Sequence, residues 1–128
     1  MANRYGQAAI LAAQQASNGA NPEALWEDAL EKLYPTSPVA RKKNGPRGAF
    51  LGLCEEGLVK GIPAGQYAAS KANKDYAVRA VALLAEGGRS WSTSALWEAV
   101  SGAPGKKHNS SMDVAMALWK NDLIVRKA

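Results

Sequence analysis

The sequence predicts a mainly α-helical protein, with two tandem three-helix units packed into one compact domain and minor β structure at the unit ends. Three observations support this fold class. The segment Ala-Leu-Trp-Glu occurs twice, at residues 24–27 and 95–98. Apolar residues recur at helical spacing between turn-forming residues, and each half ends in a short β-prone stretch. The 128 residues are 47% hydrophobic, which is enough for one buried core.

The two units are predicted from an internal match. Residues 5–27 align with residues 76–98 without a gap and share six identities, four of them in Ala-Leu-Trp-Glu. The match then resumes at an offset of 65, where Leu53 aligns with Leu118 and Val59 with Ile124. Internal matches of this kind indicate repeated structural units. The repeat covers about residues 3–61 and 74–128, and the units are placed at residues 1–69 and 70–128.

Start and stop residues divide the first unit into three helices. The first runs through RYGQAAILAAQQA and ends at Ser17-Asn18-Gly19. Pro22 opens the second, because proline is tolerated in a first helical turn, and Pro46 opens the third in the same way. Gly57 is placed to end the third helix.

The second unit repeats this order with polar caps in place of prolines. Ser70 or Asn73 is expected to cap its first helix, Thr93 or Ser94 its second, and Asn109 or Ser110 its third. The first of these helices is apolar on nearly every side over residues 76–85, so we expect it to be covered all round between the units.

Tryptophan and glycine positions predict how the helices pack. Trp26, Trp97 and Trp119 lie at helical spacing among apolar residues and are expected in the core, and Trp91 is expected to pack at the bundle end. Gly48 and Gly52 lie on one side of a helix, where two glycines together cost roughly 1–2 kcal/mol relative to alanine. Close approach of another helix, within the chain or in a dimer, is expected to offset this cost.

Two resemblances follow from these patterns. Three helices followed by GLVK or DLIVR resemble winged-helix or helix-turn-helix units, which implies a third helix in a DNA groove and an exit that forms a wing. The blocks GAFLGLCEEGLVKGIPAGQY and KKHNSSMDVAMALWKNDLI are similar to those of a family of small, mainly bacterial, uncharacterised proteins. That resemblance implies a class of protein, and it assigns no activity and no functional residues.

Positive charge is concentrated in two equivalent loops, each of which leads into a third helix. The formal net charge is +5. Helix N-termini and basic side chains both favour anions, so these loops form the candidate anion or nucleic-acid site. A solvated loop that keeps the protein soluble is the alternative explanation. The candidate residues are Arg41, Lys42, Lys43, Arg47, Lys106, Lys107, His108, Asn109 and Ser110.

The predicted function is therefore a non-enzymatic module that binds a polyanion, DNA or RNA, with weak sequence preference. Weak preference is expected because the third helices carry few of the side chains that read base edges. The rival hypothesis is a protein–protein interaction adaptor that uses an apolar groove between the units, and self-association is also open. Salt separates the two, since phosphate contacts weaken steeply as salt is added.

No enzyme, metal or cofactor site is predicted. Cys54 and His108 are the only residues of their types, so a common zinc site is excluded, and Cys54 falls on the apolar face of its helix. GAPGKK lacks the spacing of a phosphate-binding loop. No apolar run approaches the roughly 18 residues of a membrane span. We expect a cytoplasmic protein, since the single cysteine has no disulfide partner in the chain.

Overall fold

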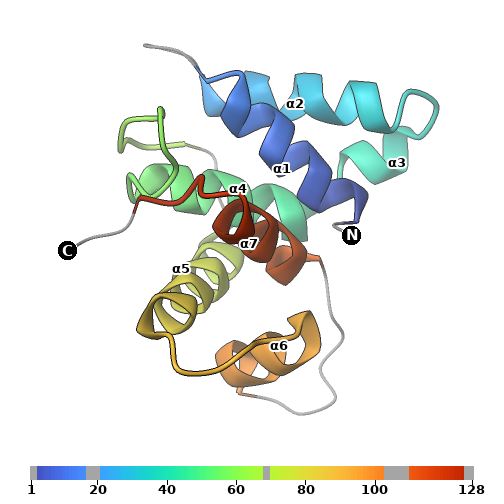
Figure 1. Cartoon of the computed structure of the whole chain (residues 1–128). Coiled ribbons are helices and arrows are strands. Elements are labelled where there is room, and N and C mark those ends of the chain that lie inside the picture. The colour runs from blue at the N-terminus through green and yellow to red at the C-terminus, as the bar shows by residue number, and fades with distance from the viewer. Residues whose placement is uncertain (1–2, 17–20, 68–69, 103–109, 126–128) are drawn as a thin grey trace.

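The computed structural model describes residues 3–16, 21–67, 70–102 and 110–125, and it confirms a mainly helical protein (Figure 1). The only β contact in these ranges is an isolated antiparallel bridge between Val59 and Ile124. The helices are α1 (Arg4–Gln14), α2 (Pro22–Leu33), α3 (Pro38–Arg41), α4 (Asn44–Glu55), α5 (Lys71–Glu86), α6 (Thr93–Ser101) and α7 (Ser111–Lys120).

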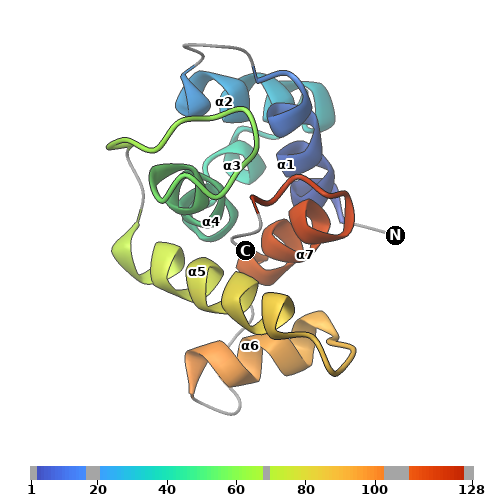
Figure 2. The same cartoon turned by 60° about the vertical axis from the view of Figure 1, so that its left-hand side comes forward.

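Helices α4 and α7 lie at the centre and pack against each other, as Figures 1 and 2 show. Helix α1 packs on α2 and α7, whereas α5 packs on α4, α6 and α7. One hydrophobic cluster includes residues of both halves, among them Trp26, Phe50, Trp97 and Leu118. The first helix of each half therefore packs on the third helix of the other half. The unit boundary between residues 69 and 70 stays a prediction.

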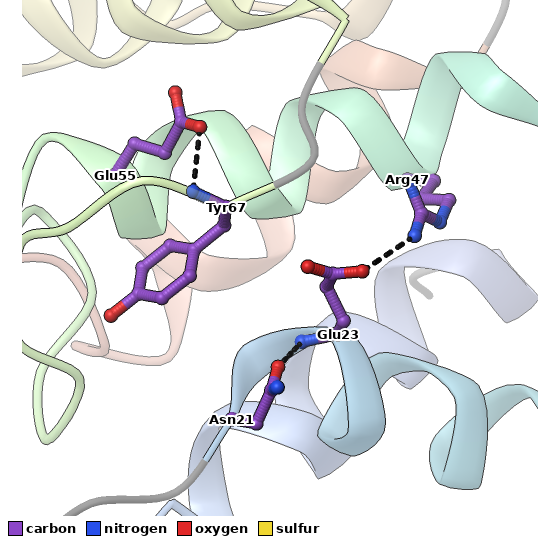
Figure 3. A network of polar contacts seen from close by, with 5 residues as sticks. All are labelled: Asn21, Glu23, Arg47, Glu55 and Tyr67. Carbon is purple, nitrogen blue, oxygen red and sulfur yellow. Dashed lines mark hydrogen bonds and ion pairs between the residues drawn. The ribbon is translucent and has the colours of Figure 1, made fainter.

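Helix starts agree with the predicted segments, and Ser70 and Ser110 hold two of the predicted N-cap positions, although neither side chain makes a capping hydrogen bond. Asn21 accepts from the Glu23 amide at the start of α2 (Figure 3). The predicted cap at Thr93 or Ser94 is wrong, because the Ser92 hydroxyl accepts from the Ala95 amide. Helix α4 begins at Asn44, so Pro46 is its third residue.

The glycine prediction is confirmed, and the close neighbour is α5 of the same chain. A Cβ added at Gly52 would lie 2.5 Å from the Lys74 Cβ and 2.7 Å from the Lys74 Cα. One added at Gly48 would lie 2.8 Å from the Asn73 Cβ. Real Cβ atoms do not approach so closely, so both glycines are needed for α4 and α5 to cross at this distance.

Helices α4 and α7 end in the same way. The Gly57 amide donates to the Cys54 carbonyl and the Leu58 amide to the Leu53 carbonyl, both at 3.0 Å. At an offset of 65 residues, Asp122 donates to the Trp119 carbonyl at 3.2 Å and Leu123 donates to the Leu118 carbonyl at 3.0 Å. Gly57 and Asp122 also share a left-handed backbone, with φ of 69° and 58°. These bonds satisfy carbonyls that a helix C-terminus leaves open.

The segments that leave α4 and α7 pair with each other. The Lys60 amide donates to the Leu123 carbonyl at 2.9 Å, and the Val125 amide donates to the Leu58 carbonyl at 2.7 Å. These two exits thus form one shared bridge, not a wing in each half. Because α4 and α7 are also buried at the centre, neither presents the free face that a recognition helix uses. The winged-helix resemblance is not confirmed.

The prediction for α5 is wrong in one respect, because this helix is not covered all round. Ala77, Ala80 and Val81 are buried, while Ala82 and Ala85 are exposed. Helix α6 covers only part of α5, and the chain between them contains Gly87 and Gly88, both with positive φ. The C-terminal half of α5 therefore keeps an apolar surface without cover from the described chain.

Candidate functional site

An apolar groove of about 610 Å³ lies along the C-terminal half of α5. One wall is α5 and Gly87, and the other is formed by the ends of α4 and α7 with their exits. We call it the α5 groove. Its volume is in the range of sites that hold small ligands or short peptide segments. Its lining residues are Glu56, Leu58, Val78, Val81, Ala82, Leu84, Ala85, Gly87, Trp119, Ile124 and Val125.

The α5 wall follows from helical spacing. Val78, Val81, Ala82 and Ala85 are separated by three, four and seven residues, which places them on one face. A helix normally buries such a stripe against its neighbours. Here Val81 is buried, but Ala82 and Ala85 are exposed, so part of the stripe remains at the surface and lines the groove.

The facing wall combines both halves of the chain. Leu58 comes from the α4 exit, while Trp119 and Val125 come from the end of α7 and its exit. Val125 is 36% exposed, one of the large apolar residues that stand out at the surface. Trp26 and Trp97 are core residues as predicted, but Trp119 is only partly buried because it forms this wall. The predicted core role of Trp119 is corrected accordingly.

Glu56 is the only charged residue that the structure places in the groove lining. Its carboxylate lies 3.2 Å from Lys74 Nζ, which also lies 3.0 Å from the Glu55 carboxylate. Hydrogen bonds to Glu55 and then to Glu56 raise the pKa of Lys74. Lys74 therefore partly balances the charge of Glu56 at the edge of an otherwise apolar lining.

A smaller hollow of about 280 Å³ lies on the other side of α5, against α6. Ala82 lines both hollows. Arg79, Glu86 and Val100 contribute to the smaller one, so its rim carries charges of both signs. Its size and charged rim make it a weaker candidate than the α5 groove.

The basic residues of the first predicted loop fall into two groups in the structure. Arg41 donates through Nη1 to the carbonyls of Tyr34 and Pro35, at 3.0 and 3.2 Å. Arg47 pairs with Glu23 at 3.3 Å (Figure 3). Both arginines therefore have partners inside the chain. Lys42 and Lys43 are exposed beside the N-terminus of α4.

Sequence reasoning missed a third exposed lysine at this surface. Lys71 begins α5, and α5 starts beside α4, since Asn73 Nδ2 donates to the Asn44 carbonyl at 3.5 Å. Neither helix start has a side-chain cap. We call Lys42, Lys43 and Lys71 the lysine surface. The approach of the two helix starts depends on the crossing at Gly48 and Gly52, and these glycines are the sequence signal that links the two segments.

Most of the second predicted basic loop lies outside the residues that the structure describes. Lys106, Lys107, His108 and Asn109 lie outside the described residues. Ser110 stands directly before α7 with a φ of 68°, and its hydroxyl makes no cap to that helix. The structure therefore describes one of the two basic loops in full.

Features of enzymes are sparse in the described part of the chain. Cys54 is buried, and desolvation raises the pKa of its thiol, so it is not an activated nucleophile. No cluster of three potential metal ligands occurs among residues 3–16, 21–67, 70–102 and 110–125. In the same ranges no helix has the length and hydropathy to cross a bilayer.

Trp91 packs against the core as predicted, with the Arg89 guanidinium 3.8 Å from its ring centre.

Comparison with known proteins gives a family but no activity. The search of curated proteins finds no match, and neither does the search of solved structures. The model of a family of unknown function, DUF6979, matches residues 2–125. This match covers nearly the whole chain and agrees with the resemblance to an uncharacterised family. The chain belongs to the DUF6979 family.

Proposed function

We propose that this protein is a non-enzymatic adaptor that binds an apolar segment of a partner protein in the α5 groove. The observation that carries the proposal is the uncovered apolar stripe of α5, which faces Leu58, Trp119 and Val125 across the groove. Concave sites lined mostly by apolar side chains are the usual places where proteins bind ligands. The proposal includes no cofactor, and it places the protein in the cytoplasm.

The buried positions of α4 and α7 favour this function over sequence-specific DNA binding. A reader of DNA bases needs a helix that is free to enter the major groove. Both central helices are instead used to join the two halves. The walls of the α5 groove come from both halves of the chain. We retain the proposal of two units, and under it the site would lie where the two units meet.

Binding of an apolar dye tests whether the groove is open. We expect the uncharged apolar dye Nile red to bind the folded protein, and we expect Ala85→Arg to weaken that binding at least tenfold by placing a charged side chain in the groove. Ala72→Arg is the matched control, since Ala72 is an exposed alanine on α5 outside the groove. Equal dye affinity for all three proteins would contradict the proposal.

A second candidate function, contact with a nucleic-acid backbone, is favoured by the lysine surface. Three exposed lysines there adjoin the starts of α4 and α5, where unpaired amides carry partial positive charge. The undescribed residues Lys106, Lys107, His108 and Asn109 would add to this site if both basic loops act together. Contacts of this kind bind DNA or RNA with little sequence preference.

Salt-dependent binding of labelled duplex DNA, single-stranded DNA and RNA tests the second candidate. We expect micromolar affinity at low salt that falls as salt is added, and loss of at least tenfold in Lys42→Ala/Lys43→Ala/Lys71→Ala. The control Lys32→Ala/Lys60→Ala/Lys120→Ala removes the same charge from other exposed lysines. Equal losses in both triple variants would show a response to net charge and would eliminate the lysine surface as a site.

A further inference from the structure

The first half of the chain covers its own exit with a short segment. Residues 61–67, which we call the strap, follow the α4 exit directly. Gly61 lies against Ala16, just after α1, since a Cβ added at Gly61 would be 3.4 Å from the Ala16 Cβ. Ile62 is only 4% exposed and belongs to the core cluster. The Gly65 amide then donates to the Glu55 carbonyl at 3.3 Å. The strap thus begins at the end of α1 and is anchored by one buried isoleucine.

Glu55 holds the far end of the strap. Its carboxylate accepts from the Tyr67 amide at 2.8 Å, as Figure 3 shows. The Tyr67 hydroxyl donates to the Pro63 carbonyl at 2.7 Å, which closes the segment on itself. These bonds hold the strap against the end of α4.

The α5 groove occupies the equivalent place in the second half. In the sequence alignment, the offset of 71 places Ala16 on Gly87, and the offset of 65 places Lys60 on Val125. Gly87 and Val125 both line the groove. The matched hydrogen bonds at the ends of α4 and α7 support this register independently of the sequence identities. The groove is therefore found where the first half has its strap.

The sequence after Val125 differs from the strap at the anchor position. Lys127 stands at the position that aligns with Ile62, so the aliphatic anchor is replaced by a charged residue. The groove wall also differs from α1, because Val78 and Ala85 align with Gln7 and Gln14, which are exposed polar residues of the first half. The second half therefore presents apolar side chains at two positions where the first half presents amides. Hollows with mostly apolar lining are the usual places where proteins bind other molecules.

We propose that the α5 groove takes an extended segment of a partner protein, with a branched aliphatic side chain in the place that Ile62 takes in the first half. This inference rests on the proposed adaptor function and specifies the chemistry of its partner. The segment would lie beside Gly87 and Val125 and place its aliphatic side chain against the α5 stripe. Burial of such a side chain supplies about 1.5–3 kcal/mol.

A peptide with the sequence of residues 58–67, Leu-Val-Lys-Gly-Ile-Pro-Ala-Gly-Gln-Tyr, is the probe. Fluorescence anisotropy of the labelled peptide is expected to show saturable binding to the full chain. Binding should weaken at least tenfold when the isoleucine of the peptide is replaced by lysine, and equally in the Ala85→Arg protein. The Ala72→Arg protein should bind as the wild type does. Equal binding of the isoleucine and lysine peptides would overturn the inference.

A variant of the protein itself gives a second readout. Arg126→Gly/Lys127→Ile/Ala128→Pro introduces the first strap residues after Val125. We expect this variant to bind the apolar dye and the peptide at least tenfold more weakly, because its own isoleucine competes for the groove. The control Arg126→Gly/Lys127→Ser/Ala128→Pro lacks the anchor and should bind both probes like the wild type. Unchanged binding by the isoleucine variant would overturn the inference.

The experiments distinguish failure of this inference from failure of the adaptor function. If the dye binds and Ala85→Arg weakens it, but the peptide does not bind, the groove is open and the extended-segment inference is wrong. If neither probe binds and sedimentation shows a dimer that Ala85→Arg dissociates, a second copy covers the groove, and both proposals are wrong. We expect the wild-type protein to sediment as a monomer.

Discussion

At the scale of the residue, Lys74 joins three parts of the fold. Its Cα and Cβ lie against Gly52, and its ammonium pairs with Glu55 and Glu56. Glu55 in turn holds the strap through the Tyr67 amide. The arrangement explains why two adjacent acids end α4, which the sequence alone indicates only as an exposed charged face.

The raised pKa of Lys74 predicts how stability changes at alkaline pH. A lysine whose pKa is higher in the folded protein stabilises the fold fully below the unfolded value of 10.5, and this stabilisation is lost as the pH rises through the folded value. Lys74→Met should lower the free energy of unfolding by about 1 kcal/mol at neutral pH. The difference between variant and wild type should shrink above pH 10.5.

Urea unfolding of wild type, Lys74→Met and Lys71→Met from pH 7 to pH 11.5 measures this effect. Lys71 is an exposed lysine in the first turn of the same helix, so its variant should follow the wild type throughout. A constant difference between Lys74→Met and wild type across this range would show that the ammonium group contributes nothing.

At the scale of the element, the crossing of α4 and α5 fixes the orientation of the groove. Gly52→Ala would gain roughly 1 kcal/mol of helix propensity. The added methyl group would nevertheless meet the backbone of Lys74, which a side-chain rotation cannot relieve. We therefore expect net destabilisation of about 1–3 kcal/mol by urea unfolding. A variant as stable as the wild type, or more stable, would mean that α5 can shift away from α4 without cost.

At the scale of the whole molecule, the sequence predicts the helices better than the surfaces. The helical spacing, the turn residues and the two glycines are local signals, and they locate the helices and one close contact. The partners of Arg41 and Arg47 are carbonyls and a carboxylate brought near by folding, so no local pattern reports them. The exposed stripe of α5 was predicted as buried because apolar periodicity does not show what lies opposite.

The pairing of the two exits could not be predicted from the sequence either, because it also depends on contacts that form only on folding. GLVK and DLIVR both indicate β structure, but each exit is too short to show its partner. The observed bridge joins Val59 and Ile124, which the predicted repeat aligns, and it forms only when the two halves of the chain come together. The lysine surface likewise depends on folding, because the starts of α4 and α5 come together only where the two helices cross.

The packing of α1 against α7 also sets an order for folding during synthesis. Helix α1, which buries Ala8 and Ala12, packs on α7, which begins at Ser111. At about 5–20 residues per second, the ribosome needs roughly 5–20 s to make the intervening residues. Throughout that interval the N-terminal helix has none of its contacts with α7. A nascent chain of this protein thus keeps apolar surface available to chaperones until its last helix has emerged.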